Sequence, residues 1–173
     1  SRFHETPNLD RLANEGARFT QAYSACTVCS PTRGALLTGK YPARLKLTDW
    51  IAGHDYPKAK LSPPQWTPRL ELGEVTLAER LKGAGYSTAH IGKWHLGGEG
   101  FEPEKQGFDS NLGGTSKGQP PSYFSPYKIA TLPDGPAGEY LTDREGEEAA
   151  RYIAAHKGGP FFLNVWFHGV HTP

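Results

Sequence analysis

The sequence contains no methionine, only two cysteines and no apolar run of the length that crosses a membrane. A bilayer-spanning helix needs about 20 consecutive apolar residues, so we expect no membrane span. Two cysteines cannot define a disulfide framework, and they leave the redox compartment undetermined. Because the formal net charge is only +1, there is no electrostatic case for binding nucleic acid or an anionic membrane surface.

Turn-forming residues, in contrast, are abundant. The 173 residues are enough for one domain with a sizeable core, but 21 glycines and 15 prolines predict extensive loops. The chain starts at Ser1 without an initiating methionine or a signal peptide, and it stops at Pro173 directly after an apolar run. We therefore expect it to be part of a longer protein.

Residues 29–40 read Cys-Ser-Pro-Thr-Arg-Gly-Ala-Leu-Leu-Thr-Gly-Lys, which predicts a helix directly after a cysteine. Pro31 suits the first position of that helix, with Ser30 as its N-cap. Cys29 then lies just before a helix N-terminus, whose N–H groups and positive dipole end attract anions. Arg33, one turn into the helix, adds a planar guanidinium suited to a tetrahedral oxyanion. A nucleophile, an anion-binding backbone and an arginine are therefore expected at one point.

A second segment places a lysine and a histidine after a strand. Residues 86–91 predict a strand, and residues 92–97 continue as Gly-Lys-Trp-His-Leu-Gly. In an extended segment Lys93 and His95 point to the same side. Lysine neutralises the charge of an anion and histidine can pass on a proton, so the pair suits an anionic substrate.

Cys26 and Cys29 also form a CxxC pattern, which is typical of thiol-redox sites and of half a zinc site. Zinc would need a second pair of ligands, and the chain has no other cysteine. The Pro-x-Arg continuation does not belong to a redox motif. We interpret Cys26 as a small residue of the pocket wall.

Residues 29–33, followed by Leu-Leu-Thr-Gly at 36–39, closely resemble the signature of type I sulfatases. Residues 85–97 resemble the second signature of that family, and two signatures in this order are far more specific than either alone. The resemblance covers essentially the whole chain and implies the alkaline-phosphatase-like fold. It also implies that residues 1–173 are part of a single sulfatase catalytic domain, with the first strand and its Asp-Asp pair, and the C-terminal portion, outside the chain.

The resemblance further implies a mechanism, the hydrolysis of a sulfate monoester. In that family a formylglycine-generating enzyme oxidises the cysteine that corresponds to Cys29. One hydroxyl of the aldehyde hydrate attacks sulfur and the alcohol leaves; the other hydroxyl then expels sulfate and restores the aldehyde. By the same resemblance Arg33 positions the nucleophile, Lys93 and His171 neutralise sulfate oxygens, and His95 orients the hydrate.

Residues after the last predicted strand and in a glycine-rich loop are candidates for substrate binding. An apolar run at 161–167 predicts a buried strand whose carboxyl end leads into His168 and His171. His171, followed by Thr172 and Pro173, matches the His-x-Pro segment of sulfatases, whereas His168 is equally well interpreted as a core histidine. Ser116 and the adjacent Lys117, which follow a flexible glycine pair, could also reach a sulfate.

The family resemblance also implies a bound Ca²⁺, which this chain would contact only through the formylglycine at position 29. The carboxylate and amide ligands are expected outside the chain, so we expect the 173 residues alone to be inactive. Implied partners are a small-molecule or glycan sulfate ester and the formylglycine-generating enzyme. The implied location is periplasmic, secreted or lysosomal.

The remaining segments predict an α/β fold with a mostly parallel sheet flanked by helices. We expect a helix that follows a turn and cap at 6–8 and ends at Gly16, and a strand over 17–23. We also expect helices opened by the capping boxes Thr76–Glu79 and Thr142–Glu145. The proline-rich loop at 48–75 either lines the substrate pocket or is a surface excursion. The aromatic residues of the loop at 98–141 either form a wall for a sugar or aryl ring or, as we prefer, fasten the loop to the domain.

Two other functions remain open on the residues alone. A phosphonate or phosphate ester hydrolase of the same superfamily would share the nucleophile and the fold. A CxxC thiol-redox protein is the alternative from a different class, and a reversible bond between Cys26 and Cys29 would favour it.

Overall fold

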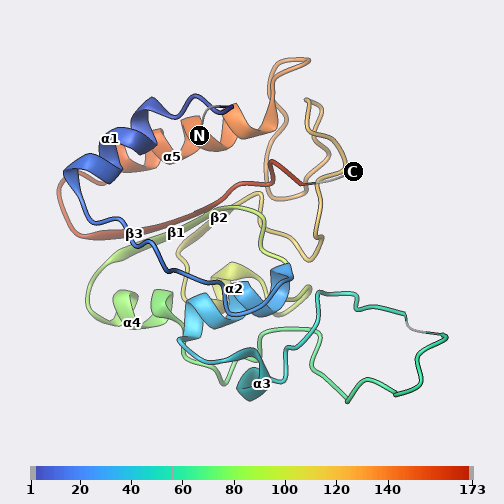
Figure 1. The fold of residues 1–173 in the computed structure, drawn as a ribbon. Helices are drawn as coiled ribbons and strands as arrows, with labels where there is room; N and C mark the ends of the chain where they lie inside the picture. Colours follow the sequence, from blue (N-terminus) through green and yellow to red (C-terminus); the bar gives the residue numbers. More distant parts are fainter. Residues whose placement is uncertain (1–2, 56, 172–173) are drawn as a thin grey trace.

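The computed structural model describes residues 3–55 and 57–171. Within these residues a sheet of three parallel strands, in the order β2-β1-β3, lies at the centre (Figure 1). The strands are β1 (Ser87–Gly92), β2 (Ser110–Leu112) and β3 (Phe161–Trp166). β1 and β3 pair along their whole length, from Ser87 opposite Phe161 to Gly92 opposite Trp166, so their carboxyl ends meet at one edge. The predicted α/β fold with a parallel sheet is confirmed.

Helices lie on both faces of this sheet (Figure 1). α5 (Leu141–Ala155) contacts β1 and β3 on one face, and α4 (Leu77–Gly83) contacts β1 on the other. α2 (Cys29–Thr38) packs on α4 and on the short α3 (Pro42–Leu45). A 3₁₀ turn, η1 (Pro103–Gln106), precedes β2. None of the helices in the described part of the chain is both long and apolar enough to cross a membrane.

The two predicted capping boxes have different outcomes. At the start of α4 the box is confirmed, because the Thr76 hydroxyl accepts a bond from the Glu79 N–H (3.1 Å) and the Glu79 carboxylate accepts one from the Thr76 N–H (2.7 Å). The box at Thr142 and Glu145 is wrong. α5 begins at Leu141 without a side-chain cap, and the Glu145 carboxylate instead accepts bonds from His168.

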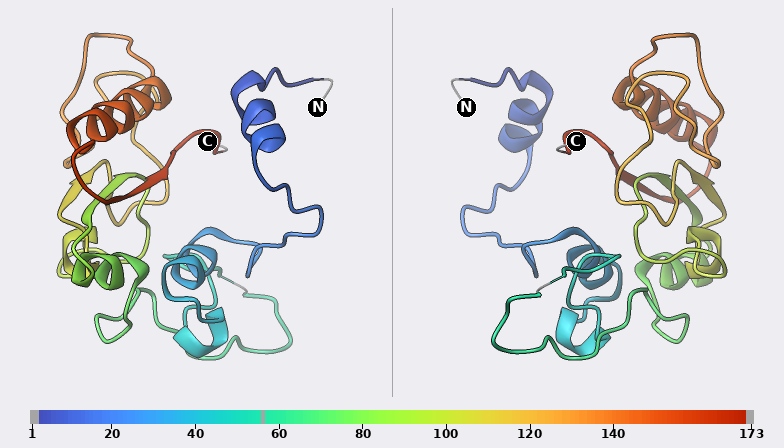
Figure 2. Two further views of the ribbon diagram at one scale, coloured as in Figure 1. Left: turned by 90° about the vertical axis from the view of Figure 1, so that its left-hand side faces the viewer. Right: turned by 90° about the vertical axis from the view of Figure 1, so that its right-hand side faces the viewer.

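The N-terminal helix α1 (Pro7–Glu15) forms as predicted, with Pro7 in its first turn and Gly16 at its end. Its apolar residues Leu9 and Leu12 are 65% and 67% exposed, and Figure 2 shows the helix standing away from the sheet. The strand predicted over 17–23 is wrong. This segment is exposed throughout, and no strand of the described chain lies beside it to accept and donate its backbone hydrogen bonds.

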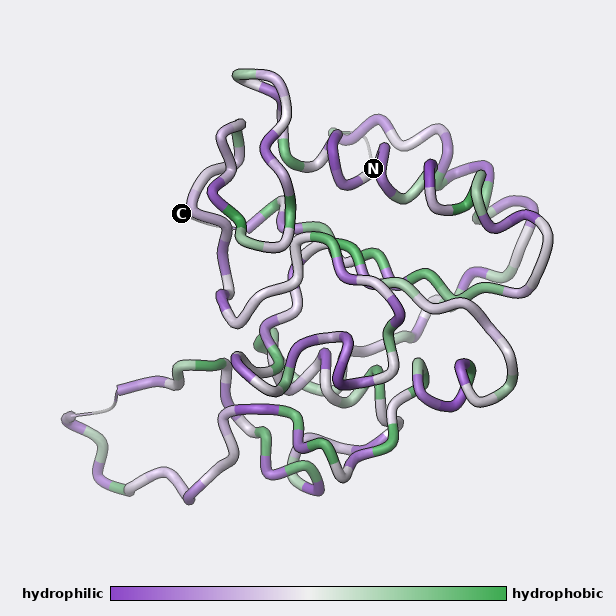
Figure 3. The backbone as a smooth tube through the Cα atoms, turned by 180° about the vertical axis from the view of Figure 1, so that it is seen from behind, coloured by the Kyte–Doolittle hydropathy of each residue, from purple (hydrophilic) through white to green (hydrophobic). Residues whose placement is uncertain are grey.

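The main core lies between the sheet and the helices α2, α3 and α4. Its buried members come from these helices and from the loops, including the turn after β1: Leu37, Leu45, Leu47, Leu70, Ala78, Trp94, Leu96 and Phe108. Figure 3 shows hydrophobic segments gathered along the strands of the sheet. The loop that follows α3, teal to green in Figure 1, extends outward from this core, and its described residues form no helix or strand, as its prolines predict.

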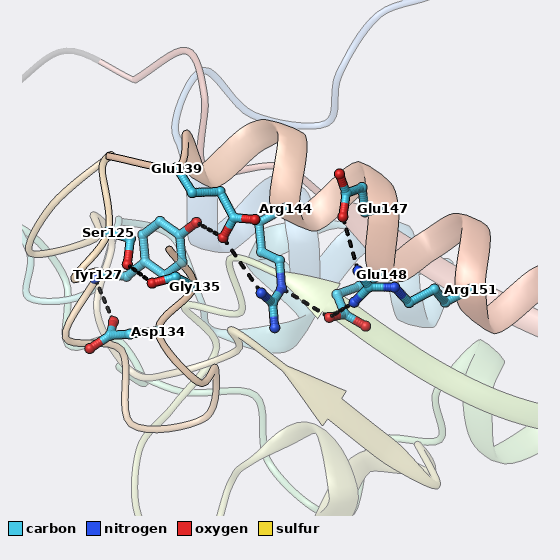
Figure 4. Close-up of polar contacts among 9 residues, drawn as sticks. All are labelled: Ser125, Tyr127, Asp134, Gly135, Glu139, Arg144, Glu147, Glu148 and Arg151. Atoms are coloured by element: carbon cyan, nitrogen blue, oxygen red, sulfur yellow. Dashed lines mark hydrogen bonds and ion pairs between the residues drawn. The ribbon is translucent and has the colours of Figure 1, made fainter. Parts of the chain in front are cut away.

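The loop before α5 is fastened to that helix by a polar network (Figure 4). The Tyr127 hydroxyl donates to the Glu139 carboxylate (2.6 Å), which also faces Arg144 of α5 (3.5 Å). Arg144 in turn donates to Glu148 (2.9 Å), one turn further along the helix. Tyr127 is fully buried in a second small core, so its ring fastens the loop, as preferred, and offers no wall for a substrate.

Candidate active site

Four of the five predicted catalytic side chains line one cavity of about 660 Å³. They are Cys29, Lys93, His95 and His171. Cys29 comes from the first turn of α2, Lys93 and His95 follow the carboxyl end of β1, and His171 follows β3. Parallel strands that end at a common edge bring these distant residues together.

Cys29 is the first residue of α2, two positions deeper in the helix than the sequence predicts. Val28 is the N-cap, with extended backbone and no side-chain cap. Ser30 is not the cap because it is fully buried, where its hydroxyl accepts a bond from the Ile51 N–H (3.1 Å). Position 29 therefore lies within the first turn, whose N–H groups have no intrahelical acceptor and favour an anion.

The His95 ring lies against Cys29. Its Nδ1 lies 3.2 Å from the Cys29 Sγ, and its Nε2 bonds to the carbonyl of Ile51. Because a carbonyl only accepts, we assign the proton to Nε2, which leaves Nδ1 as the acceptor that faces position 29. Burial, opposed by the Ile51 bond and reinforced by the nearby charges of Lys93 and Arg33, lowers the pKa of His95 to about 4, so the ring is neutral near pH 7.

Two cations complete this side of the cavity. The Lys93 ammonium lies within hydrogen-bonding reach of the Cys29 sulfur; burial lowers the pKa of Lys93 and the cysteine partly restores it. Arg33 donates from Nη1 to the Lys93 carbonyl (2.5 Å), and its guanidinium lies 4.6 Å from the ring centroid of Trp166. Burial lowers the pKa of Arg33 to about 10, so it stays charged near neutral pH. Arg33 lines a neighbouring pocket that also contains Cys29.

The backbone that presents Lys93 and His95 differs from the prediction. β1 ends at Gly92, and His95 adopts a left-handed φ of 57°. The two side chains reach the same cavity through this turn and not through an extended strand. Gly92 itself has a φ of 94°, and a Cβ there would lie 2.2 Å from the Trp166 carbonyl oxygen, so the turn requires glycine.

His171 and His168 occupy different environments. His171 lines the cavity and lies 2.9 Å, Nδ1 to Nε2, from Gln119. Thr172 and Pro173, which complete the predicted His-x-Pro segment, lie outside the described residues. His168 is 4% exposed, and its Nδ1 lies 2.5 Å from the Glu145 carboxylate beneath the site. It does not line the cavity, which agrees with its interpretation as a core histidine.

Ser116 is also placed apart from Cys29. It lines a separate cavity of about 220 Å³ beside Trp94, whereas the next residue, Lys117, lines the main one together with Gly118 and Gln119. The choice between adjacent loop residues depends on the direction in which the turn points each side chain, and no spacing rule predicts that direction. Lys117 is therefore the residue that reaches the site.

The loop at 48–75 contributes Trp50, Ile51 and His54 to the cavity. Of the two interpretations of this loop, pocket wall and surface excursion, the first is correct for these residues and the second for its outer part, where Leu61 is 84% exposed. The sequence signal was a tryptophan and a histidine in a long proline-rich loop. This signal indicated that the loop could line the pocket, but it did not identify which of its residues do so.

No carboxylate from the described residues lines the main cavity, and no three His, Cys, Asp or Glu side chains among them gather into a metal-binding group. A hard cation such as Ca²⁺ prefers six to eight oxygen ligands. The residues present therefore do not fit a calcium ion.

We expect the 173-residue chain to bind Ca²⁺ only weakly, with a dissociation constant above about 10⁻³ M, because its cavity offers cations and imidazoles in place of carboxylates. Titration calorimetry with CaCl₂ measures this directly. Tight binding would instead point to Asp10, Asp49 and Asp55, the first carboxylates to replace.

Comparison with known proteins identifies the class. The family model described as Sulfatase matches residues 1–173, so the chain belongs to the sulfatase family. Mouse N-acetylgalactosamine-6-sulfatase is 40% identical over 193 aligned positions, which cover 98% of this chain and 36% of that protein. The pig protein of the same name is 41% identical over 133 residues, 76% of this chain and 24% of its own length. The chain thus spans 24–36% of the length of these relatives.

A solved structure agrees with this assignment. Ps i-CgsB, determined in complex with k-i-k-neocarrahexaose, superposes with a TM-score of 0.74 at 27% identity, covering 97% of this chain and 40% of that one. The fold is therefore the alkaline-phosphatase-like fold of sulfatases, as the resemblance implied.

Proposed function

We propose that the protein hydrolyses sulfate monoesters at the cavity around Cys29. The observation that carries this proposal is the 3.2 Å approach of the His95 Nδ1 to the Cys29 Sγ, with Lys93 beside the sulfur, in a chain of the sulfatase family. The His95 Nδ1 is a hydrogen-bond acceptor and the Lys93 ammonium is a cation. Both residues are buried, and both groups face position 29. Such an arrangement stabilises negative charge that develops on a sulfuryl group.

Position 29 is a cysteine here, and its Sγ marks the place of the oxygens that a formylglycine would carry. Oxidation of Cys29 to formylglycine by a formylglycine-generating enzyme supplies an aldehyde whose hydrate contains the attacking hydroxyl. The Nδ1 lone pair of His95 accepts a hydrogen bond from this position and orients it. Because the pKa of His95 is about 4, the ring remains an acceptor near neutral pH.

The cations divide the remaining roles. Lys93 neutralises a sulfate oxygen next to the nucleophile, and His171, at the other wall of the cavity, neutralises a second oxygen or protonates the leaving group. Arg33 donates to the Lys93 carbonyl and thereby positions Lys93 relative to the nucleophile.

We further propose a sulfated saccharide as substrate. Support comes from the mouse relative, whose name specifies an N-acetylgalactosamine 6-sulfate, and from a solved structure with a TM-score of 0.71 and 28% identity, in complex with its substrate D-glucosamine-2-N,6-O-disulfate. We also propose that residues 1–173 are part of a single catalytic domain, since the family match runs through all of them. A periplasmic, secreted or lysosomal location is proposed on family membership.

Co-expression with a formylglycine-generating enzyme tests the proposal. We expect an aldehyde at position 29 and an intact thiol at Cys26, detected by peptide mass analysis with an aldehyde-reactive tag. The modified full-length protein should then hydrolyse 4-nitrophenyl sulfate faster than 4-nitrophenyl phosphate. A preference for the phosphate ester would assign the enzyme to the phosphate ester hydrolases of the same superfamily, and a reversible Cys26–Cys29 disulfide without tagging would favour the redox alternative.

Gly118, which packs against the His95 ring, allows a test of the position of that ring. A Cβ on Gly118 would lie 2.7 Å from the His95 Cε1, and the ring cannot retreat because Ile51 and Cys29 hold its two nitrogens. We expect Gly118→Ala to lower kcat/KM for 4-nitrophenyl sulfate by about 10- to 100-fold, the scale for displacing a catalytic group by about 1 Å. Gly146→Ala in α5, where a Cβ meets nothing within 4 Å, is the matched control and should leave the rate unchanged.

A further inference from the structure

The segment Asp49 to His54 is anchored to both signature motifs. Its central residue, Ile51, donates its N–H to the Ser30 hydroxyl (3.1 Å) and offers its carbonyl to the His95 Nε2. Ser30 directly follows Cys29 in the chain, and the His95 ring contacts the Cys29 sulfur. The segment is therefore positioned by the residues that surround the nucleophile, although it lies in a loop without regular structure.

The polar side chains of this segment are bonded to one another. One Asp49 oxygen accepts from the Trp50 N–H (2.8 Å) and the other from the His54 N–H (2.9 Å). The His54 Nδ1 lies 2.6 Å from the Asp49 carboxylate, to which it donates. The Trp50 Nε1 lies 3.1 Å and 3.2 Å from the two nitrogens of the His54 ring, so the indole N–H faces the imidazole ring. The indole and imidazole rings stand nearly perpendicular, at 89° with centroids 5.6 Å apart. The orientation of both rings is thus set before any ligand binds.

Packing against Trp66 also restricts the turn between Trp50 and His54. Gly53 has a φ of 94°, and a Cβ there would lie 2.8 Å from the Trp66 ring. Trp66 packs against the main core. Trp50 and His54 line the cavity that contains Cys29, so a rigid aromatic surface and a carboxylate-backed imidazole flank the place where the sulfate ester reacts.

This combination suits a sugar ring better than a sulfate ion. A pyranose presents an apolar face of C–H groups and a rim of hydroxyl groups, which match an aromatic surface with polar groups at its edge. Sulfate has no apolar face and is matched by Lys93 and His171 in the same cavity. The cavity therefore combines groups suited to a sugar ring with groups suited to a sulfate.

We propose that Trp50 and the Asp49–His54 pair form the subsite for the sugar ring that carries the sulfate, and that they determine the specificity for the leaving group. This inference rests on the proposed function. The sugar ring lies against Trp50, and its hydroxyl groups bond to the imidazole of His54, which Asp49 holds in place. Nothing in either signature motif encodes this contact.

Binding to the full-length protein that carries Cys29→Ala tests the subsite without requiring turnover. In that background calorimetry compares N-acetylgalactosamine 6-sulfate with inorganic sulfate. We expect Trp50→Ala to weaken binding of the sugar sulfate by about 10- to 100-fold and His54→Ala by about 5- to 10-fold, on the scale of one lost stacking contact and one lost hydrogen bond. Neither change should alter the affinity for inorganic sulfate by more than about twofold.

Leu61→Ala, in the exposed outer part of the same loop, is the control and should leave both affinities unchanged. Trp50→Phe should restore most of the sugar affinity, because a smaller aromatic face remains. Equal loss of both ligands in the Trp50→Ala protein, or no loss of the sugar sulfate, would overturn the subsite. Failure of the proposed function is separate: it would appear as absent hydrolysis in the modified protein, not in this comparison.

Discussion

Cys29→Ala should abolish hydrolysis of sulfate esters by the full-length protein, whereas Cys26→Ala should retain it. Alanine at position 29 can form no formylglycine, so the attacking hydroxyl is lost and the rate falls to that of the uncatalysed reaction. Cys26 is only half buried and does not line the main cavity, so its replacement should cost about 1 kcal/mol of stability and little activity. Initial rates with 4-nitrophenyl sulfate, together with melting curves, separate the two effects.

The outcome also decides between the sulfatase and the redox alternatives. A redox pair needs both thiols, so the two substitutions would then be equally damaging to the chemistry. Equal loss of activity, with both proteins folded, would return the CxxC interpretation to consideration. Retention of activity by Cys29→Ala would remove the basis of the proposed mechanism.

Lys93→Ala should lower kcat/KM for sulfate esters by roughly 10²–10³, the scale for losing one buried group that stabilises charge in the transition state. Lys93 is 2% exposed and lies beside the sulfur of Cys29, where its charge is poorly screened. His171→Ala should give a loss of similar size, because it removes the neutralising group at the other wall. Steady-state kinetics with 4-nitrophenyl sulfate measures both.

Lys105→Ala provides the control for charge alone, since that lysine is exposed on η1 and far from the cavity lining. It should change kcat/KM by less than about twofold, as expected for a surface substitution. Lys93→Arg should recover only part of the activity, because the larger planar group cannot replace an ammonium in a buried position. Full activity of Lys93→Ala would mean that the lysine only fills space.

Local sequence predicted those elements whose determinants lie within a few residues. The capping box at Thr76 and Glu79 requires only contacts inside one helical turn, and it forms as predicted. The apolar run that became β3 carries its own burial signal, since a strand of a parallel sheet is covered on both faces. Gly39 ends α2 in the left-handed conformation that favours glycine.

The predictions that proved wrong depend on partners that are distant in sequence. Ser30 and Glu145 both have the residue type of a helix cap, but each is buried and bonded elsewhere, to Ile51 and to His168. A buried hydroxyl or carboxylate bonds to whichever group the fold brings near, and its desolvation makes that contact outweigh a cap. Residues 17–23 alternate like a strand but have no neighbouring strand with which to pair.

The sequence by itself determined the family and indicated the proposed nucleophilic position and the cations around it, because two signature motifs encode chemistry that demands those residue types at those spacings. The tertiary structure alone decided which side chains share the cavity. It brought Lys117 rather than Ser116, and His171 rather than His168, into the main cavity, and it placed Trp50 and His54 in the same cavity. The reason is geometric: the direction of a loop side chain depends on the packing of the whole chain around it, and no local pattern carries that information.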